Sequence, residues 1–164
     1  RIGYNHLVLT NESSMLVEDC QFEYNPTSTI YFSSNLRVID GSYIHLFPEE
    51  DLINNIAIIS NIALNYARED LSLFSISLKK KYKKETHESV IRKKLVHYFG
   101  GSESNYTFEK SFLINKGTIK QQVGFFDQEK TFHGKYTPCG DYFENGSIEG
   151  ATISGIKAYE QLKK

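Results

Sequence analysis

The sequence predicts an α+β fold built on a mixed, largely antiparallel sheet. Short runs rich in β-branched and aromatic residues recur along the chain, several of them with alternating apolar and polar positions. One segment has apolar residues at helical spacing, and a strand, a polar loop and a second helical segment close the sequence. This order is typical of a sheet with one amphipathic helix, followed by a C-terminal strand-loop-helix.

The composition is that of an ordinary soluble globular protein. Hydrophobic residues make up 40% of the 164 positions and charged residues 24%, and the net charge is −1. We therefore expect no nucleic-acid partner, and the apolar runs are too short for an integral membrane span. Cys20 and Cys139 are the only cysteines and lie far apart. This spacing argues against a disulfide or zinc site and predicts a cytoplasmic location.

Strands are expected where β-forming residues are bounded by turn signals. Asn25-Pro26 indicates a turn, and Asp40-Gly41 predicts the turn of a hairpin. Residues Leu71–Leu78 alternate between apolar and polar, which predicts a strand with one buried face. The predicted strands are Leu7–Thr10, Ser28–Phe32, the hairpin arms 36–39 and 42–47, Asn55–Ser60 and Leu71–Leu78.

A helix is predicted from His87 to Phe99, in the second half of the chain. Thr86 is its predicted N-cap, and Gly100 is expected to end it. Its apolar stripe consists of Ile91, Leu95 and Tyr98. Tyr106–Ile114 alternates again and predicts a strand, and Thr118–Phe126 is a weaker strand candidate.

The last thirty residues contain the sharpest chemical signal. Gly140-Asp141 follows a predicted strand, Ser147 is a natural N-cap, and Gly150 lies in the first turn of the next helix. Glycine allows a ligand to approach the backbone, and the N–H groups of a helix N-terminus favour an electron-rich oxygen. A turn and a capped helix also occur in many folds, so spacing alone leaves both interpretations open. The predicted buried stripe of this helix is Ile148, Ala151, Thr152, Tyr159 and Leu162.

This segment resembles the C-terminal flavin-binding signature of FAD-dependent oxidoreductases of the amine-oxidase and phytoene-desaturase-like superfamily. The matching residues are Gly140-Asp141, Gly146 to Ala151, Ser154-Gly155 and Ala158. Leu7–Thr10 resembles the strand that closes the Rossmann-type dinucleotide-binding part, and the strands between 29 and 77 resemble those of the substrate domain. The resemblance implies a strand and turn of the FAD-binding domain at 1–20, a substrate-binding domain at 21–132 and a C-terminal FAD-binding segment at 133–164.

The resemblance also implies roles for individual residues. Asp141 would accept hydrogen bonds from the ribityl hydroxyls of FAD, and its backbone N–H would face the pyrophosphate. The backbone N–H near Ile148 would contact the flavin C2 carbonyl. The cofactor-binding residues would be Gly140, Asp141, Ser147, Ile148, Glu149, Gly150 and Ala151. The complete enzyme would transfer a hydride from a C–N or C–C bond to a non-covalently bound flavin.

The chain departs from the family pattern in two places. The N-terminal Gly-x-Gly-x-x-Gly motif that binds the adenosine half of FAD is absent. We therefore expect a fragment with an incomplete FAD site, inactive alone, whose partner is the missing dinucleotide-binding half. Amine-oxidase members often place a lysine near the flavin on the strand that corresponds to Thr27–Ile30, and this sequence has none there. No catalytic residue is assigned.

Other candidate residues have weaker signals. Tyr31, Tyr43 and His45 could line the pocket for a small or lipophilic substrate, and ordinary sheet packing is the favoured alternative for them. The five histidines show no metal-ligand spacing, so no metal site is expected. Lys79–Lys84 is interpreted as a solvated surface, with contact to an anionic membrane or nucleic acid as the alternative. The alternative function is a non-catalytic α+β ligand-binding or interaction module.

Overall fold

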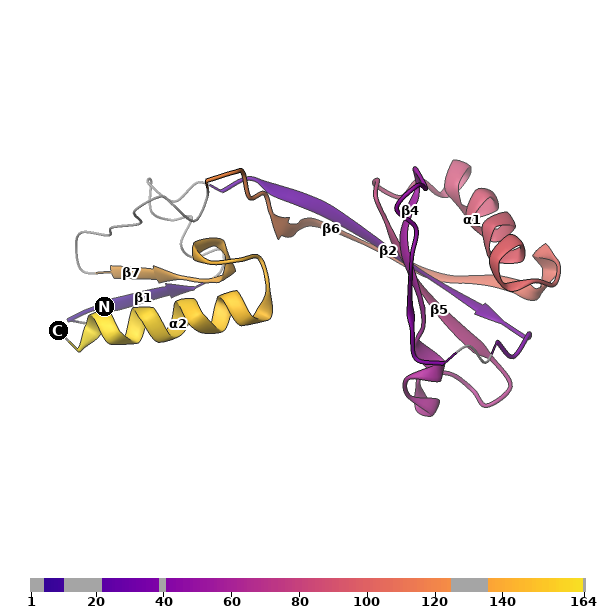
Figure 1. Ribbon diagram of the computed structural model, residues 1–164, viewed down its shortest axis with the longest axis horizontal. Helices are drawn as coiled ribbons and strands as arrows, with labels where there is room; N and C mark the ends of the chain where they lie inside the picture. Colours follow the sequence, from indigo (N-terminus) through magenta and orange to yellow (C-terminus); the bar gives the residue numbers. More distant parts are fainter. Residues whose placement is uncertain (1–4, 11–21, 39–40, 125–135, 164) are drawn as a thin grey trace, which may run out of the picture. The chain divides into compact units, whose positions relative to one another are not determined.

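The computed structural model describes residues 5–10, 22–38, 41–124 and 136–163. These residues belong to two compact units (Figure 1): one contains residues up to 25 and from 116 onward, and the other contains residues 26–115. We call them the terminal unit and the sheet unit. The domain boundaries predicted near 20 and 132 both lie outside the described residues.

The sheet unit is built on five strands in the order β3-β4-β5-β2-β6. The pairs β2·β5, β4·β5 and β3·β4 are antiparallel, which confirms the predicted fold class. β2 and β6 are long strands that contribute residues to both units. The strands are β2 (Tyr24–Ser34), β3 (Ile44–Leu46), β4 (Ile53–Ile58), β5 (Ser72–Leu78) and β6 (Tyr106–Ile119).

The helix α1 (Lys84–Phe99) covers one face of this sheet (Figure 1). Alternation along β5 places Phe74, Ile76 and Leu78 on the covered face, as predicted. Each fully buried aliphatic or aromatic side chain stabilises the fold by about 1.5–3 kcal/mol, so this layer dominates the stability of the unit. The fully buried members of the core are Ile30, Phe32, Ile53, Ile56, Phe74, Ile76, Ile91, Leu95 and Tyr106.

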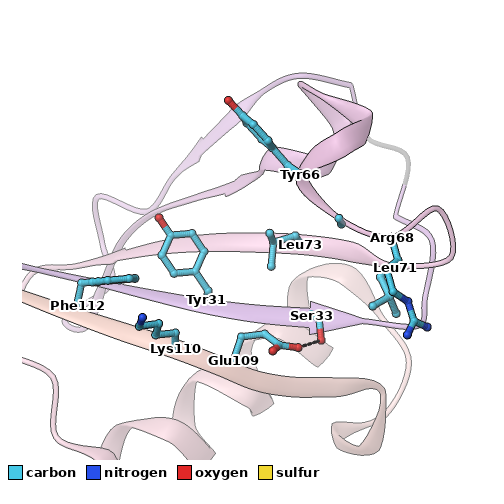
Figure 2. Close-up of a pocket in the computed structure, with 10 residues that line it drawn as sticks. Tyr31, Ser33, Tyr66, Arg68, Leu71, Leu73, Glu109, Lys110 and Phe112 are labelled. Atoms are coloured by element: carbon cyan, nitrogen blue, oxygen red, sulfur yellow. Dashed lines mark hydrogen bonds between the residues drawn. The ribbon is translucent and has the colours of Figure 1, made fainter.

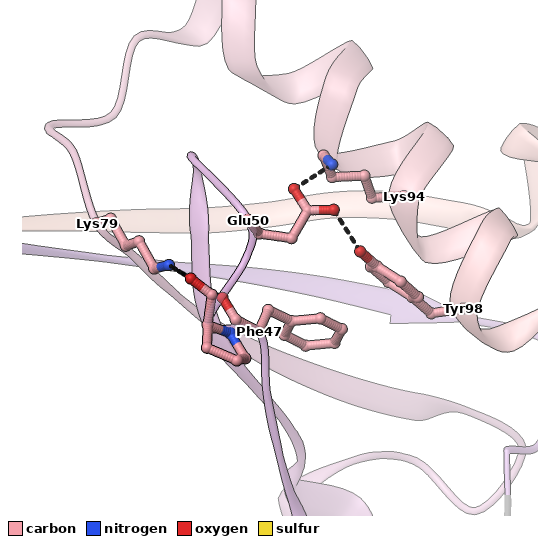
Figure 3. A network of polar contacts seen from close by, with 6 residues as sticks. Phe47, Glu50, Lys79, Lys94 and Tyr98 are labelled. Atoms are coloured by element: carbon pink, nitrogen blue, oxygen red, sulfur yellow. Dashed lines mark hydrogen bonds and ion pairs between the residues drawn. The ribbon is translucent and has the colours of Figure 1, made fainter.

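A polar network joins α1 to the turn between β3 and β4 (Figure 3). The carboxylate of Glu50 accepts hydrogen bonds from the Lys94 ammonium and from the Tyr98 hydroxyl, the latter at 2.5 Å. Lys79 donates to the carbonyls of Phe47 at 3.0 Å and Pro48 at 2.8 Å. The network therefore fixes the last turns of α1 against the edge of the sheet.

Two predictions made from turn signals differ from the structure, and residues 39–40 of the second lie outside the described residues. Asn25-Pro26 lies inside β2, just before the stretch that pairs with β5 from Ser28 onward. The predicted hairpin is wrong in its described part: residues 36–38 are not a strand, and β3 pairs with β4 instead. The short turn after Phe47 brings β3 and β4 together. The backbone N–H of Val38 donates to the side-chain hydroxyl of Ser72 at 2.9 Å and not to the backbone of a neighbouring strand.

The boundaries of two predicted elements also differ. α1 begins at Lys84, and Thr86 is not its N-cap. Lys83 takes that position, and its backbone N–H donates to Nδ1 of His87 at 3.1 Å. Lysine and glutamate are good helix formers, which explains why the helix extends by a turn. β6 continues to Ile119, so it includes the start of the weaker strand predicted from Thr118.

In its described residues, the terminal unit contains a two-stranded parallel sheet of β1 (Leu7–Thr10) and β7 (Tyr136–Cys139). A short 3-10 turn, η6 (Asp141–Phe143), follows β7 and leads through a loop to α2 (Ile148–Leu162). The predicted C-terminal strand-loop-helix is confirmed. No helix in the described residues is long and apolar enough to cross a membrane.

We expect Glu50→Gln to lower the free energy of unfolding by about 1 kcal/mol at neutral pH, because charge-assisted hydrogen bonds are lost. The hydrogen bond from Lys94, and then that from Tyr98, lowers the pKa of Glu50 below its ordinary value of 4.5. A lowered pKa stabilises the fold above the unfolded-state pKa, and this stabilisation is lost as the pH falls through the folded-state pKa.

Urea titrations of wild type and variant should therefore converge as the pH drops below 4.5. Glu49→Gln is the matched control, since Glu49 is exposed in the same turn. A difference between Glu50→Gln and wild type that is independent of pH would contradict the assignment.

Candidate functional site

The helix α2 packs on the terminal unit through small side chains. Gly150, Ser154 and Ala158 are its buried residues, and they repeat every four positions along one face. The hydroxyl oxygen of Ser154 accepts the backbone N–H of Gly140 at 3.0 Å. The end of β7 is thereby joined directly to the middle of α2.

The predicted buried stripe of α2 is therefore wrong. Ile148 is 89% exposed, Tyr159 57% and Leu162 44%, and the remaining two members, Ala151 and Thr152, are exposed as well. The small residues on the opposite side of the helix allow a close approach to β7, and the larger apolar residues project away from this contact. Spacing alone favoured the larger side chains because it cannot show which face meets the strand.

The N-terminus of α2 is capped as predicted. The Ser147 hydroxyl accepts the N–H of Gly150 at 3.0 Å and donates to the side-chain oxygen of Asn145. The first backbone N–H groups of a helix have no partner within it. Those of Ile148 and Glu149 take part in none of the hydrogen bonds found in the described part of the chain. They can donate to an acceptor at the positive end of the helix dipole.

Two glycines of this segment, Gly140 and Gly150, have structural explanations. A Cβ at Gly140 would lie 2.3 Å from the ring of Tyr142, and a Cβ at Gly150 would lie 2.0 Å from the carbonyl oxygen of Asn145. Tyr142 is fully buried, and its hydroxyl donates to the carbonyl of Cys139 at 2.6 Å. Both glycines are thus required by the packing of the loop itself. Their presence alone does not indicate a ligand.

Asp141 differs from these glycines, because packing does not explain it. Its side chain is half-buried, and its carboxylate bonds no side chain or backbone group among the described residues. The carbonyl of Asp141 accepts the N–H of Glu144 at 3.2 Å, which fixes the backbone around it. A fixed, partly buried carboxylate with free lone pairs can accept hydrogen bonds from a hydroxyl-bearing ligand.

Residues distant in sequence hold the loop that carries Asp141. Gln121 donates its amide to the carbonyl of Glu144 at 2.6 Å, and Lys157 of α2 pairs with the Glu144 carboxylate at 2.6 Å. The ring of Phe22 packs 4.7 Å from that of Tyr142. Sequence analysis missed these three residues. Only the tertiary fold brings them to the loop, and no local motif marks them.

Of the candidate pocket residues, Tyr31 lies in a pocket of about 390 Å³ on the sheet face opposite α1 (Figure 2). Its ring packs edge-on against Phe112 at 5.9 Å. Glu109 accepts a hydrogen bond from the buried hydroxyl of Ser33. The lining is mainly apolar and comprises Tyr31, Ser33, Tyr66, Ala67, Arg68, Leu71, Leu73, Glu109, Lys110 and Phe112. Its size is within the range of small-molecule sites.

Tyr43 and His45 do not line this pocket. Tyr43 is 67% exposed. His45 pairs with Ile56 across β3 and β4, and its ring packs edge-on against Phe99 of α1 at 5.4 Å. It therefore lies on the face that α1 covers. The structure does not bring the three candidate pocket residues together.

Comparisons with known proteins show the fold of the chain. A crystal structure of a Pyrococcus furiosus protein is 15% identical, with a TM-score of 0.59, and the match covers 93% of this chain and 35% of that one. A crystal structure described as an oxidoreductase from Methanosarcina mazei is 14% identical, with a TM-score of 0.59, and the match covers 85% of this chain and 35% of that one.

At these identities the likeness shows a shared fold alone. This chain corresponds to about a third of the length of both proteins. No family model and no curated protein matches the chain.

We expect Gly140→Ala to lower the free energy of unfolding by about 1–3 kcal/mol, because the added methyl group meets the buried ring of Tyr142. Gly155→Ala should instead raise it by about 0.5–1 kcal/mol, since Gly155 lies inside α2 with nothing within 4 Å of the new methyl group. Urea unfolding followed by circular dichroism measures both variants. An unchanged or raised free energy of unfolding for Gly140→Ala would show that the Tyr142 contact does not determine the choice of glycine.

Proposed function

We propose that this chain is the substrate-binding and C-terminal flavin-contacting part of a FAD-dependent oxidoreductase of the amine-oxidase and phytoene-desaturase-like class. The observation that carries this proposal is the Asp141 loop, which leads directly into the Ser147-capped N-terminus of α2. This loop and helix contain the residues that resemble the flavin-binding signature. The likeness of the chain to a structure described as an oxidoreductase supports the same class.

The residues of the terminal unit fit the polar groups of FAD. The half-buried carboxylate of Asp141 offers lone pairs for ribityl hydroxyls, and the N–H groups of Ile148 and Glu149 suit a carbonyl or phosphate oxygen. The helix dipole places partial positive charge at the same end of α2. The chemistry that FAD supplies when bound is the acceptance of a hydride.

The parallel pair β1·β7 supports the proposal that a dinucleotide-binding half completes the enzyme. Parallel sheets normally have both faces covered, and a two-stranded sheet is marginal by itself. Leu7 is 38% exposed and Val8 40% exposed in β1. Further strands from the missing half would bury these side chains and extend the sheet.

The pocket that contains Tyr31 is the proposed substrate site. Its apolar floor, which includes Leu71 and Leu73, suits a small or lipophilic molecule. The Glu109 carboxylate, oriented by Ser33, provides one polar contact. The proposed reaction is oxidation of a C–N or C–C bond, and no residue of the chain is assigned as its acid or base.

A non-catalytic ligand-binding module is the second candidate function. One observation favours it: internal packing alone accounts for Gly140 and Gly150. The visible spectrum of the purified full-length product separates the two functions. Flavin absorption in the product, or its appearance after FAD is added, would support the enzyme, and the absence of both would exclude it.

We expect Asp141→Ala in the full-length protein to weaken FAD retention by about tenfold or more, because a hydrogen bond to a charged acceptor contributes about 1.5–3 kcal/mol. Retention is measured from the flavin absorbance that remains after gel filtration. Glu160→Gln is the control, since Glu160 is an exposed carboxylate on α2. Equal retention by wild type and Asp141→Ala would overturn the role of Asp141.

A further inference from the structure

Positive charge is concentrated in the segment from Lys79 to Lys94. It contains eight of the 19 Lys and Arg residues of the chain and only two glutamates, so its net charge is +6. The whole chain has a net charge of −1. The segment therefore creates a local positive field that the overall composition conceals.

Internal contacts use three of these eight cations. Lys79 bonds two backbone carbonyls, Lys94 pairs with Glu50, and Arg92 pairs with Glu88 at 2.9 Å. The other five have no carboxylate partner among the described residues, and all five are exposed. Four of them follow one another at the start of α1, and we call these four the lysine cluster: Lys80, Lys81, Lys83 and Lys84. Lys93 lies nine residues beyond Lys84, on the opposite side of the helix.

The fold does not need the lysine cluster for its own stability. Lys83 and Lys84 are the N-cap and the first residue of α1, where the helix dipole is positive. Basic residues are unfavourable at this end, and Lys83 provides no side-chain cap. The like charges also repel one another. The pattern is explained by an external anionic partner better than by folding.

The chemistry of the cluster selects among anionic partners. All its members are lysines, which act as point charges, and the single arginine of the segment is occupied by Glu88. Protein surfaces that bind nucleic acid typically also contain arginines, which donate paired hydrogen bonds, and exposed aromatic rings, which stack on bases. The nearby ring of Tyr82 is stacked on Phe108 at 6.1 Å instead. We propose that the lysine cluster is a docking surface for anionic phospholipid membranes.

The proposal is tested by sedimentation of the full chain with phosphatidylcholine vesicles that either contain or lack phosphatidylserine. Binding should require phosphatidylserine and should be lost at high salt. Lys80→Gln/Lys81→Gln should weaken it by about 25-fold, on the basis of about fivefold for each lysine near an anionic surface. Thermal unfolding of the variant checks that its fold is unchanged.

Lys110→Gln/Lys163→Gln is the matched control. It changes the net charge equally, and its lysines lie over the rings of Phe112 and Tyr159, outside the cluster. This variant should bind vesicles within about twofold of wild type. An equal loss of vesicle binding in both variants would show that overall charge alone determines binding, and this result would overturn the proposal. Equal binding to both vesicle types, or tighter binding to a single-stranded oligonucleotide at the same salt, would also overturn it.

Discussion

The burial of one face of the five-stranded sheet by α1 is the constraint on which the sheet unit depends. Ile91 and Leu95 of the helix lie fully buried in the same core as Phe32 and Phe74 of the sheet. Because one helix covers one face, the opposite face keeps its side chains partly exposed, and the pocket beside Tyr31 forms there. The same packing turns the other side of α1 outward, where Lys93 is exposed.

Within the terminal unit, the buried ring of Tyr142 has a comparable role. The ring leaves no room for a side chain at position 140 and packs against Phe22. Its hydroxyl donates a hydrogen bond to the carbonyl of Cys139 at the end of β7. The backbone on both sides of Asp141 is consequently fixed before any ligand arrives. Preorganisation of this kind reduces the entropy lost on binding, so a turn that packs for structural reasons is also a suitable place for a ligand contact.

Local patterns determined most of what the sequence could predict. Alternation identified β5, helical spacing identified the buried residues of α1, and the Ser147 cap located α2. The partner of β3 and the buried face of α2 depend on which elements meet in space, and short-range spacing carries no such information. The same limit applies to the candidate site: a motif marked Asp141, whereas Gln121 and Lys157 reach its loop only through tertiary structure.

The pairing of β1 with β7 has a consequence for the order of folding. His6 and Thr137, which are hydrogen-bonded beside this pair, lie 131 positions apart along the chain. The β4·β5 and β3·β4 pairs of the sheet unit join segments that are much closer in sequence. Closing the longer loop costs more chain entropy, so the strands of the sheet unit should form first and bring the two segments of the terminal unit together. The loop that carries Asp141 would then be among the last parts of the chain to acquire its structure.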